Sequence, residues 1–359
     1  MINGPIAVLG ANGFVGSHIL RYLRANGCSV RAVVRRPPAS DGNYRIADAC
    51  DVYALREAFH DCEYVVHAAL GDNYTITGSI APVYAAAEAV AARRLIYISS
   101  GSVHGQSPRP GTDERSSLSI RHAFSYNNAK VRAERKLARL RARGTVETVI
   151  LRPTIVFGPG SRWVFDFADS LQNGTASLVD GAHGICNSIY VDNLSFGVML
   201  ALTAPNVDGE AFLLADAETV RWRDLYRPIA EAFGVDFDTV PSVSPRPPET
   251  TLRQRYLDPV LASELLETVK QIVPRDTREH VKRALRHAIR SARGFISAAP
   301  PPSGGVPDEI AELQRCQWRF PHDKAARMLG YAPPVSFAEG CRHSIAWLRE
   351  RSRRMSLAS

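Results

Sequence analysis

Residues 6–23, IAVLGANGFVGSHILRYL, join a short apolar run to three glycines spaced three positions apart and then to apolar residues at helical spacing. This order predicts a β-strand, a tight turn and an α-helix. Glycines in such a turn let the backbone approach a pyrophosphate, and the free N–H groups of the helix N-terminus attract its charge. The stretch therefore predicts a dinucleotide site. Its expected residues are Gly10, Asn12, Gly13, Phe14, Val15 and Gly16.

A glycine triplet alone is a weak signal, because similar turns occur without a ligand. Here a second apolar strand follows the helix at residues 29–34, which supplies the strand–helix–strand context of a nucleotide-binding unit. Strand and helix patterns alternate over the first two-thirds of the 359 residues. We therefore predict an α/β fold, a Rossmann-type doubly wound parallel sheet with a smaller C-terminal substrate lobe.

The end of the second predicted strand favours one dinucleotide. An acidic side chain there would hold the ribose hydroxyls of NAD(H) and repel a 2′-phosphate. The chain instead places Arg35 and Arg36 directly after Val34, and guanidinium groups bind phosphate well. We expect NADP(H) to be preferred, with NAD(H) possible, unless both arginines only begin a solvated loop. Asp48 is a candidate partner of the adenine amino group, or a turn residue.

Three polar residues predict hydride-transfer chemistry. Ser100 follows an apolar strand at residues 94–98, so its hydroxyl is expected at the carboxyl edge of the sheet, where ligands bind. Tyr126 and Lys130 are four apart in a helical stretch and share one face. A phenol titrates near 10, so a nearby ammonium group would help it act as a base. A tyrosine followed four residues later by a lysine is also a pattern that occurs by chance.

In their order and spacing these motifs resemble the extended short-chain dehydrogenase/reductase superfamily, the NAD(P)-dependent epimerase/dehydratase family. The resemblance runs from Ile6 to about Phe237 and resumes at residues 318–349. It implies a catalytic triad of Ser100, Tyr126 and Lys130, and often a homodimer. Five further stretches carry it: residues 65–69 (VVHAA), 99–105 (SSGSVHG), 151–160 (LRPTIVFGPG), 190–193 (YVDN) and 329–331 (LGY). The cofactor contacts that it adds are Ala68, Ala69, Pro153 and Ile155.

Departures from the family pattern bear on the substrate. Dehydratases of the family carry an Asp-Glu pair after the catalytic serine, where this chain has Gly101 and Ser102, so the resemblance argues against a sugar dehydratase. Members that act on nucleotide sugars usually have an asparagine at Thr154 or Ile155, and a diphosphate-gripping segment near the C-terminus that is missing here. The residues expected to meet the substrate are Ser102, His104 and Arg152.

Two enzymatic functions follow, both at a secondary alcohol or ketone. The first is an oxidoreductase or epimerase that acts on a sugar or nucleotide sugar, where an epimerase would keep its cofactor. The alternative is an NADPH-dependent ketoreductase of the dihydroflavonol reductase or 3β-hydroxysteroid dehydrogenase type, which would exchange it. A non-catalytic NADP-sensing regulator is a third possibility, against which the intact Ser100, Tyr126 and Lys130 argue.

The predicted domains are an NAD(P)-binding domain at residues 1–180, with sheet elements recurring to about 237, and a substrate lobe at residues 181–359. Residues 241–317 are an expected insertion with a basic helical stretch. Between residues 270 and 293 there are eight basic and two acidic side chains, which accounts for most of the net charge of +8. This stretch could cover the site, attract an anionic substrate, touch an anionic membrane surface, or simply be a solvated helix face.

The composition narrows the remaining classes. No stretch approaches the ~20 apolar residues of a membrane span, and no signal sequence precedes the first strand. The six cysteines have no Cys-x-x-Cys spacing, so we expect a cytoplasmic protein without a structural metal. No nucleic-acid recognition fold is visible. The expected partner is a small-molecule substrate.

Overall fold

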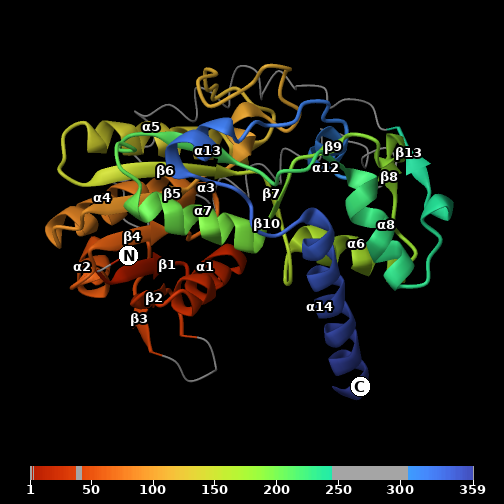
Figure 1. Ribbon diagram of the computed structural model, residues 1–359, viewed down its shortest axis with the longest axis horizontal. Coiled ribbons are helices and arrows are strands. Elements are labelled where there is room, and N and C mark those ends of the chain that lie inside the picture. The colour runs from red at the N-terminus through yellow and green to blue at the C-terminus, as the bar shows by residue number, and fades with distance from the viewer. Residues whose placement is uncertain (1, 3, 38–42, 245–305, 359) are drawn as a thin grey trace, which may run out of the picture.

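The computed structural model describes residues 2, 4–37, 43–244 and 306–358, and its centre is a seven-stranded sheet (Figure 1). All neighbouring strands of this sheet run parallel. From one edge to the other they are β11 (Ala211–Leu214), β6 (Glu147–Pro153), β5 (Arg94–Ile98), β4 (Tyr64–His67), β1 (Ile6–Leu9), β2 (Val30–Val34) and β3 (Tyr44–Ile46). The chain order reverses between β1 and β4, which is where doubly wound folds bind their ligands. The predicted fold class is confirmed.

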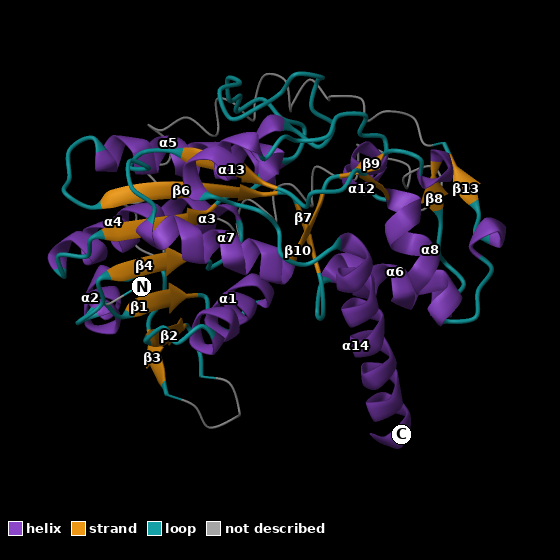
Figure 2. Ribbon diagram, viewed as in Figure 1, coloured by secondary structure: helices purple, strands orange, loops and turns teal. Residues whose placement is uncertain are grey.

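Helices cover both faces of the sheet, as Figure 2 shows. One face carries α1 (Phe14–Ala25), α7 (Val191–Thr203) and α13 (Asp323–Leu329). The other carries α2 (Val52–Phe59), α3 (Asn73–Gly78), α4 (Ile80–Ala89) and α5 (Ser125–Arg141). Within β1, Ile6 and Val8 pack toward the first group, and Ala7 and Leu9 pack toward the second. Because both faces are buried, a central strand such as β1 is apolar along its whole length instead of alternating with polar residues.

A second hydrophobic core is built around the fully buried Trp222. Aromatic contacts hold it together: the rings of Phe167 and Tyr226 stack at 3.9 Å, and Trp163 meets Trp222 edge-on at 5.8 Å. Its helices are α6 (Arg162–Gln172), α8 (Trp222–Ala232) and α14 (Phe337–Ala358). Three short strand pairs accompany it: β7 (Ile155–Phe157) with β10 (Ser188–Tyr190), β9 (Ile185–Cys186) with β12 (Val220–Arg221), and β8 (Leu178–Val179) with β13 (Ser242–Val243).

The two cores interleave along the chain. After residue 180 the chain still contributes α7 and β11 to the central sheet and its cover, in line with the expected recurrence of sheet elements. The domain boundary at residue 180 stays a prediction. The basic stretch at residues 270–293 lies outside the described residues. The last part of the expected insertion is described and includes α12 (Asp308–Gln314).

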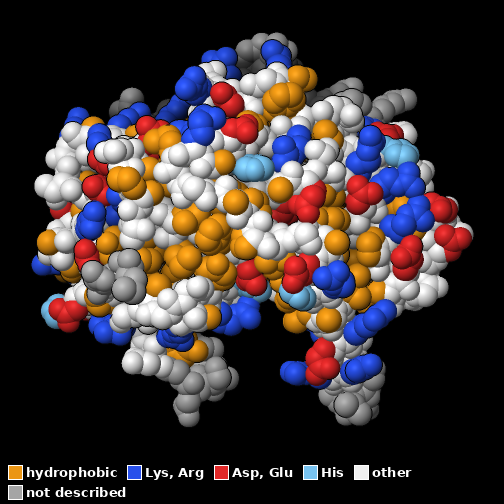
Figure 3. All heavy atoms as spheres, viewed as in Figure 1, with side chains coloured by type: hydrophobic (Ala, Val, Ile, Leu, Met, Phe, Trp, Pro, Cys, Tyr) orange, Lys and Arg blue, Asp and Glu red, His pale blue; other side chains and the backbone are white. Residues whose placement is uncertain are grey.

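Charged side chains of both signs are scattered over the face in Figure 3, and basic ones gather on the protruding end of α14. Four exposed arginines lie there: Arg349, Arg351, Arg353 and Arg354. Among the helices that the structure describes, none combines the length and the apolar character that crossing a bilayer requires. The six cysteines are all free thiols.

Candidate active site

The glycine turn after β1 forms a backbone cradle. Gly10 has a φ of +86°, and a Cβ there would lie 2.7 Å from the Cα of Ala69 in the loop after β4. A Cβ on Gly16 would lie 2.1 Å from the carbonyl oxygen of Gly10, so only glycine lets α1 pack this closely. Gly13 caps α1 without a side-chain hydrogen bond, which leaves the helix N-terminal N–H groups to a ligand. This cradle fits the pyrophosphate of a dinucleotide.

The expected adenosine end of the site lies at the ends of β2 and β3. Arg35 and Arg36 are exposed directly after β2, and the Asn12 amide donates to the carbonyl of Arg36 at 3.4 Å. The exposed Asp48 carboxylate accepts a hydrogen bond from the backbone N–H of Cys50 at 2.9 Å. Asp48 therefore has the turn-forming contact that the sequence left as an alternative to an adenine contact.

Ser100 and Tyr126 meet at the carboxyl edge of the sheet. Ser100 follows β5 and begins the short 3₁₀ helix η1 (Gly101–His104), where its hydroxyl accepts from the Ser102 N–H at 3.2 Å. Tyr126 lies in the first turn of α5, and its phenol is within hydrogen-bonding reach of Ser100. Burial raises the pKa of Tyr126 to about 12; the Ser100 contact lowers it, and the charge of Glu309 raises it.

Lys130 is buried one helical turn after Tyr126. Its ammonium group lies 5.9 Å from the centre of the Tyr126 ring and donates to the carbonyl oxygen of Ile98 at 2.9 Å. Burial lowers the pKa of Lys130 to about 8, and the charge of Glu134 opposes that shift. At neutral pH Lys130 is therefore still mostly cationic, while Tyr126 keeps its proton. For the chain alone, burial of the phenol outweighs the cation that the sequence placed beside it.

Arg152 and His104 belong to a buried polar network. Arg152 is 5% exposed and forms an ion pair with Glu134, which is 4% exposed, at 2.7 Å. The Glu134 carboxylate also accepts from the Ser99 hydroxyl, and the Arg152 guanidinium meets the His104 ring at 3.3 Å. Burial, followed by the charge of Arg152, lowers the pKa of His104 to about 4, so that ring is neutral. Most of the donors of Arg152 are thus used inside the protein.

The other expected contacts lie in η1 and at or near the ends of β4 and β6. The Ser102 hydroxyl oxygen is buried, and within the described residues it has no hydrogen-bond partner. The carbonyl oxygen of Pro153, at the end of β6, lies 3.5 Å from where a Gly101 Cβ would stand. Ile155, two residues later, donates its N–H to the carbonyl of Asn187 at 2.7 Å. Ala68 and Ala69 follow β4, and the Ala68 N–H is bonded to the Leu9 carbonyl at 3.0 Å.

The C-terminal segment also contributes to the site, which no sequence pattern had indicated. The Gln106 side chain donates to Glu309 of α12 at 2.7 Å. The centre of the Phe320 ring lies 5.8 Å from the centre of the His104 ring, and the Phe320 ring packs next to Gly101. Glu134 was also missed, although its position four residues after Lys130 is a usable signal. No local pattern marks Glu309, because the contact depends on chain segments 203 residues apart.

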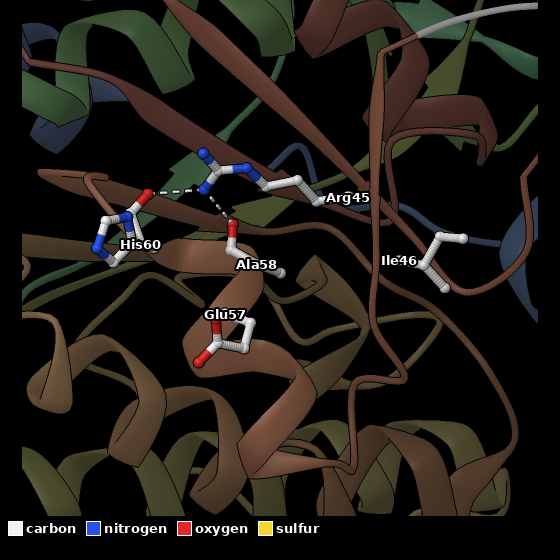
Figure 4. Close-up of a pocket in the computed structure, with 5 residues that line it drawn as sticks. All are labelled: Arg45, Ile46, Glu57, Ala58 and His60. Carbon is white, nitrogen blue, oxygen red and sulfur yellow. Dashed lines mark hydrogen bonds between the residues drawn. The ribbon is translucent and has the colours of Figure 1, made fainter.

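A separate shallow depression of about 380 Å³ lies between β3 and the end of α2 (Figure 4). Arg45 crosses it and donates to the carbonyls of Ala58 and His60 at 2.9 and 2.6 Å, which caps the end of α2. This arginine therefore has a structural role. No three metal-binding side chains come together in the part of the chain that the structure describes.

Comparisons with known proteins show the family of the chain. Residues 6–215 match the NAD dependent epimerase/dehydratase family. The chain is 29% identical over 261 residues to 3 beta-hydroxysteroid dehydrogenase/Delta 5-->4-isomerase of Mycobacterium tuberculosis, covering 64% of this chain and 70% of that protein. It is 24% identical over 246 residues to UDP-glucose 4-epimerase of Vibrio cholerae, covering 63% and 75%. It shares the fold of MoeE5 solved in complex with UDP-glucose and NAD, with a TM-score of 0.67, 19% identity, and coverage of 97% and 99%. The chain belongs to the NAD dependent epimerase/dehydratase family and is an NAD(P)-dependent oxidoreductase or epimerase of the extended short-chain dehydrogenase/reductase type.

Proposed function

We propose that the protein is an NADP(H)-preferring ketoreductase that interconverts a ketone and a secondary alcohol at Ser100, Tyr126 and Lys130. The observation that carries this proposal is the contact between the Tyr126 phenol and Ser100 at the end of β5, with Lys130 buried one turn later. When bound, the nicotinamide supplies or takes the hydride. We assign the diphosphate to the glycine cradle, from Gly10 to Gly16.

The three side chains have distinct roles in the proposed reduction. The substrate carbonyl oxygen accepts hydrogen bonds from the Ser100 hydroxyl and the Tyr126 phenol, which orients the carbon and stabilises the charge that develops on oxygen. Tyr126 then gives its proton to the alkoxide, and its pKa of about 12 keeps that proton available at neutral pH. The Lys130 cation stabilises the phenolate that is left.

The assignment of a reductase rests on several features together. The diphosphate-gripping segment that the family resemblance implies for enzymes of nucleotide sugars is missing from the sequence, and the guanidinium of Arg152 is paired with Glu134. A 3β-hydroxysteroid dehydrogenase is among the relatives at 29% identity. An epimerase or oxidoreductase of a sugar or nucleotide sugar is the second candidate, which the similarity to UDP-glucose 4-epimerase favours.

Cofactor exchange separates the two candidates. The absorbance and mass of any nucleotide that remains on the purified protein would be measured first. The stripped protein would then be titrated with NADPH and NADH, and assayed with simple ketones and with UDP-glucose. An empty protein that exchanges NADPH freely and reduces ketones supports the reductase. A tightly retained nucleotide together with interconversion of UDP-sugars would support the epimerase instead of the reductase. Failure to bind either nucleotide would reject both functions.

The preference for NADP(H) predicts a specific effect of Arg35 and Arg36. Replacing both by serine should weaken NADPH binding by roughly 10- to 100-fold, because charge-assisted bonds to the 2′-phosphate are lost. NADH binding should change little. Fluorescence titration would give both Kd values, with Arg24→Ser as control, since Arg24 is exposed at the far end of α1. Equal weakening of both cofactors would show that these arginines do not read the phosphate.

Further proposals concern assembly and location. The six free thiols are compatible with a reducing cytoplasm, which supports the proposed cytoplasmic location. The homodimer remains a proposal from family resemblance, and light scattering after gel filtration would test it. Contact of the segment around residues 270–293 with anionic lipid would be tested by vesicle sedimentation.

A further inference from the structure

Helix α12 is held at one end by the second core. The Trp222 indole donates to the carbonyl of Leu313 at 3.0 Å, and the Gln314 side chain accepts from the N–H of Val179 at 2.9 Å. The first turn of the helix faces the other way, toward the loop that follows η1. There Gln106, only 6% exposed, donates to the Glu309 carboxylate at 2.7 Å. These contacts fix Glu309 beside the loop that begins at the catalytic Ser100.

The Glu309 carboxylate is half-buried, and its hydrogen bond among the described residues is with a neutral amide. Its Oε1 accepts from Gln106, and within the described ranges no lysine, arginine or histidine forms an ion pair with it. Its charge acts on the active site, since it raises the pKa of the Tyr126 phenol. A half-buried carboxylate without a cation costs stability, so Glu309, held by Gln106 beside the loop that follows Ser100, is available to a ligand.

Two basic residues around η1 do not offset this negative charge. Arg152, which meets His104 of η1 at 3.3 Å, is paired with Glu134, and His104 is neutral because its pKa is lowered to about 4. The Ser102 hydroxyl lies in the same loop, buried and without a partner in the described structure. The substrate side of the site therefore offers a carboxylate acceptor and a hydroxyl, and no free positive charge from these residues.

We propose that Glu309 is a specificity-determining residue that accepts a hydrogen bond from a hydroxyl or ammonium group next to the reacting carbon of the substrate. The same charge excludes a carboxylate or phosphate from that position, because two anions in a half-buried site repel each other. This inference rests on the proposed function. It gives the substrate a neutral or cationic donor beside its ketone, in contrast to the anionic substrate that the basic sequence suggested.

Three related ketones test the proposal in NADPH-dependent reduction: acetophenone, 2-hydroxyacetophenone and phenylglyoxylate. The measured quantity is kcat/KM for 2-hydroxyacetophenone divided by kcat/KM for acetophenone. In Glu309→Gln we expect this ratio to fall on the order of tenfold, because a charge-assisted hydrogen bond is replaced by a weaker neutral one. The relative kcat/KM for phenylglyoxylate should rise. Glu312→Gln, on the same helix, is the matched control and should leave both ratios unchanged. Unchanged ratios in Glu309→Gln would overturn the proposal.

A second measurement does not depend on turnover, and so separates this inference from the proposed function. Tyrosine labelled with ¹³C at Cζ would be titrated by NMR, with the Tyr126 signal assigned from its loss in Tyr126→Phe. Ser100, Lys130, Tyr97 and Glu309 face this phenol. Glu309→Gln should lower the pKa of Tyr126, since a negative charge that raises it is removed. All three ketones could prove inert. In that case an unchanged pKa of Tyr126 in Glu309→Gln would mean that Glu309 is not in the site. A changed pKa would mean that only the ketoreductase assignment has failed.

Discussion

A Tyr126→Phe variant is expected to lose roughly 10²- to 10⁴-fold in kcat while it binds NADPH with a nearly unchanged Kd. The ring and its packing persist, so the fold and the glycine cradle are preserved. What is lost is the proton that the phenol would give to the alkoxide, together with one of the two hydrogen bonds to the reacting oxygen. Initial rates of NADPH oxidation with a ketone that the wild type reduces, and fluorescence titration with NADPH, measure the two effects separately.

Tyr84→Phe is the matched control for this variant. Tyr84 is also buried, and its hydroxyl donates to the carbonyl of Val146 at 3.3 Å, between α4 and the start of β6. Removing that hydroxyl tests the general cost of deleting a buried phenol, and kcat should stay within about twofold. Full activity in Tyr126→Phe would reject the proposed proton donor, and parallel loss of kcat and NADPH binding would point to a structural role.

The second large effect concerns stability. Arg152→Met should lower the free energy of unfolding by about 3–5 kcal/mol, because it leaves the buried Glu134 carboxylate without its cation. Adding Glu134→Gln should recover a substantial part of that loss, since the neutral amide no longer needs a counter-charge. Urea denaturation of the wild type and of these two variants at pH 7 provides the measurement.

An exposed ion pair supplies the comparison. Arg354 and Glu350 lie one turn apart on α14 at 2.9 Å, with 77% and 53% of their side chains exposed. Arg354→Met should therefore cost less than about 0.5 kcal/mol. If Arg152→Met costs no more than this, the guanidinium is free to serve the substrate, as its place in the sequence motif had suggested.

Features that depend on contacts close in the sequence were predicted correctly, and features that depend on distant contacts were not. The glycine turn, the apolar strands and the four-residue spacing of Tyr126 and Lys130 are local features whose conformation depends on neighbouring residues, so they were readable directly. The family resemblance then gave the order of the motifs, and the parallel sheet agrees with it. The sign of the Tyr126 pKa shift was not readable, because it depends on how deeply the fold buries the phenol.

The sequence patterns were therefore sufficient for the fold class, and the family resemblance added the enzyme family and most of the site candidates. The pairing of Arg152 with Glu134, and the approach of Glu309 to Gln106, needed the folded chain. In the first case the sequence motif identifies Arg152, but it does not identify the carboxylate that forms an ion pair with it. In the second, two segments about 200 residues apart meet only because α12 docks on the second core. Charge compensation and burial are properties of three-dimensional neighbours, and they decide which polar residues remain available to a substrate.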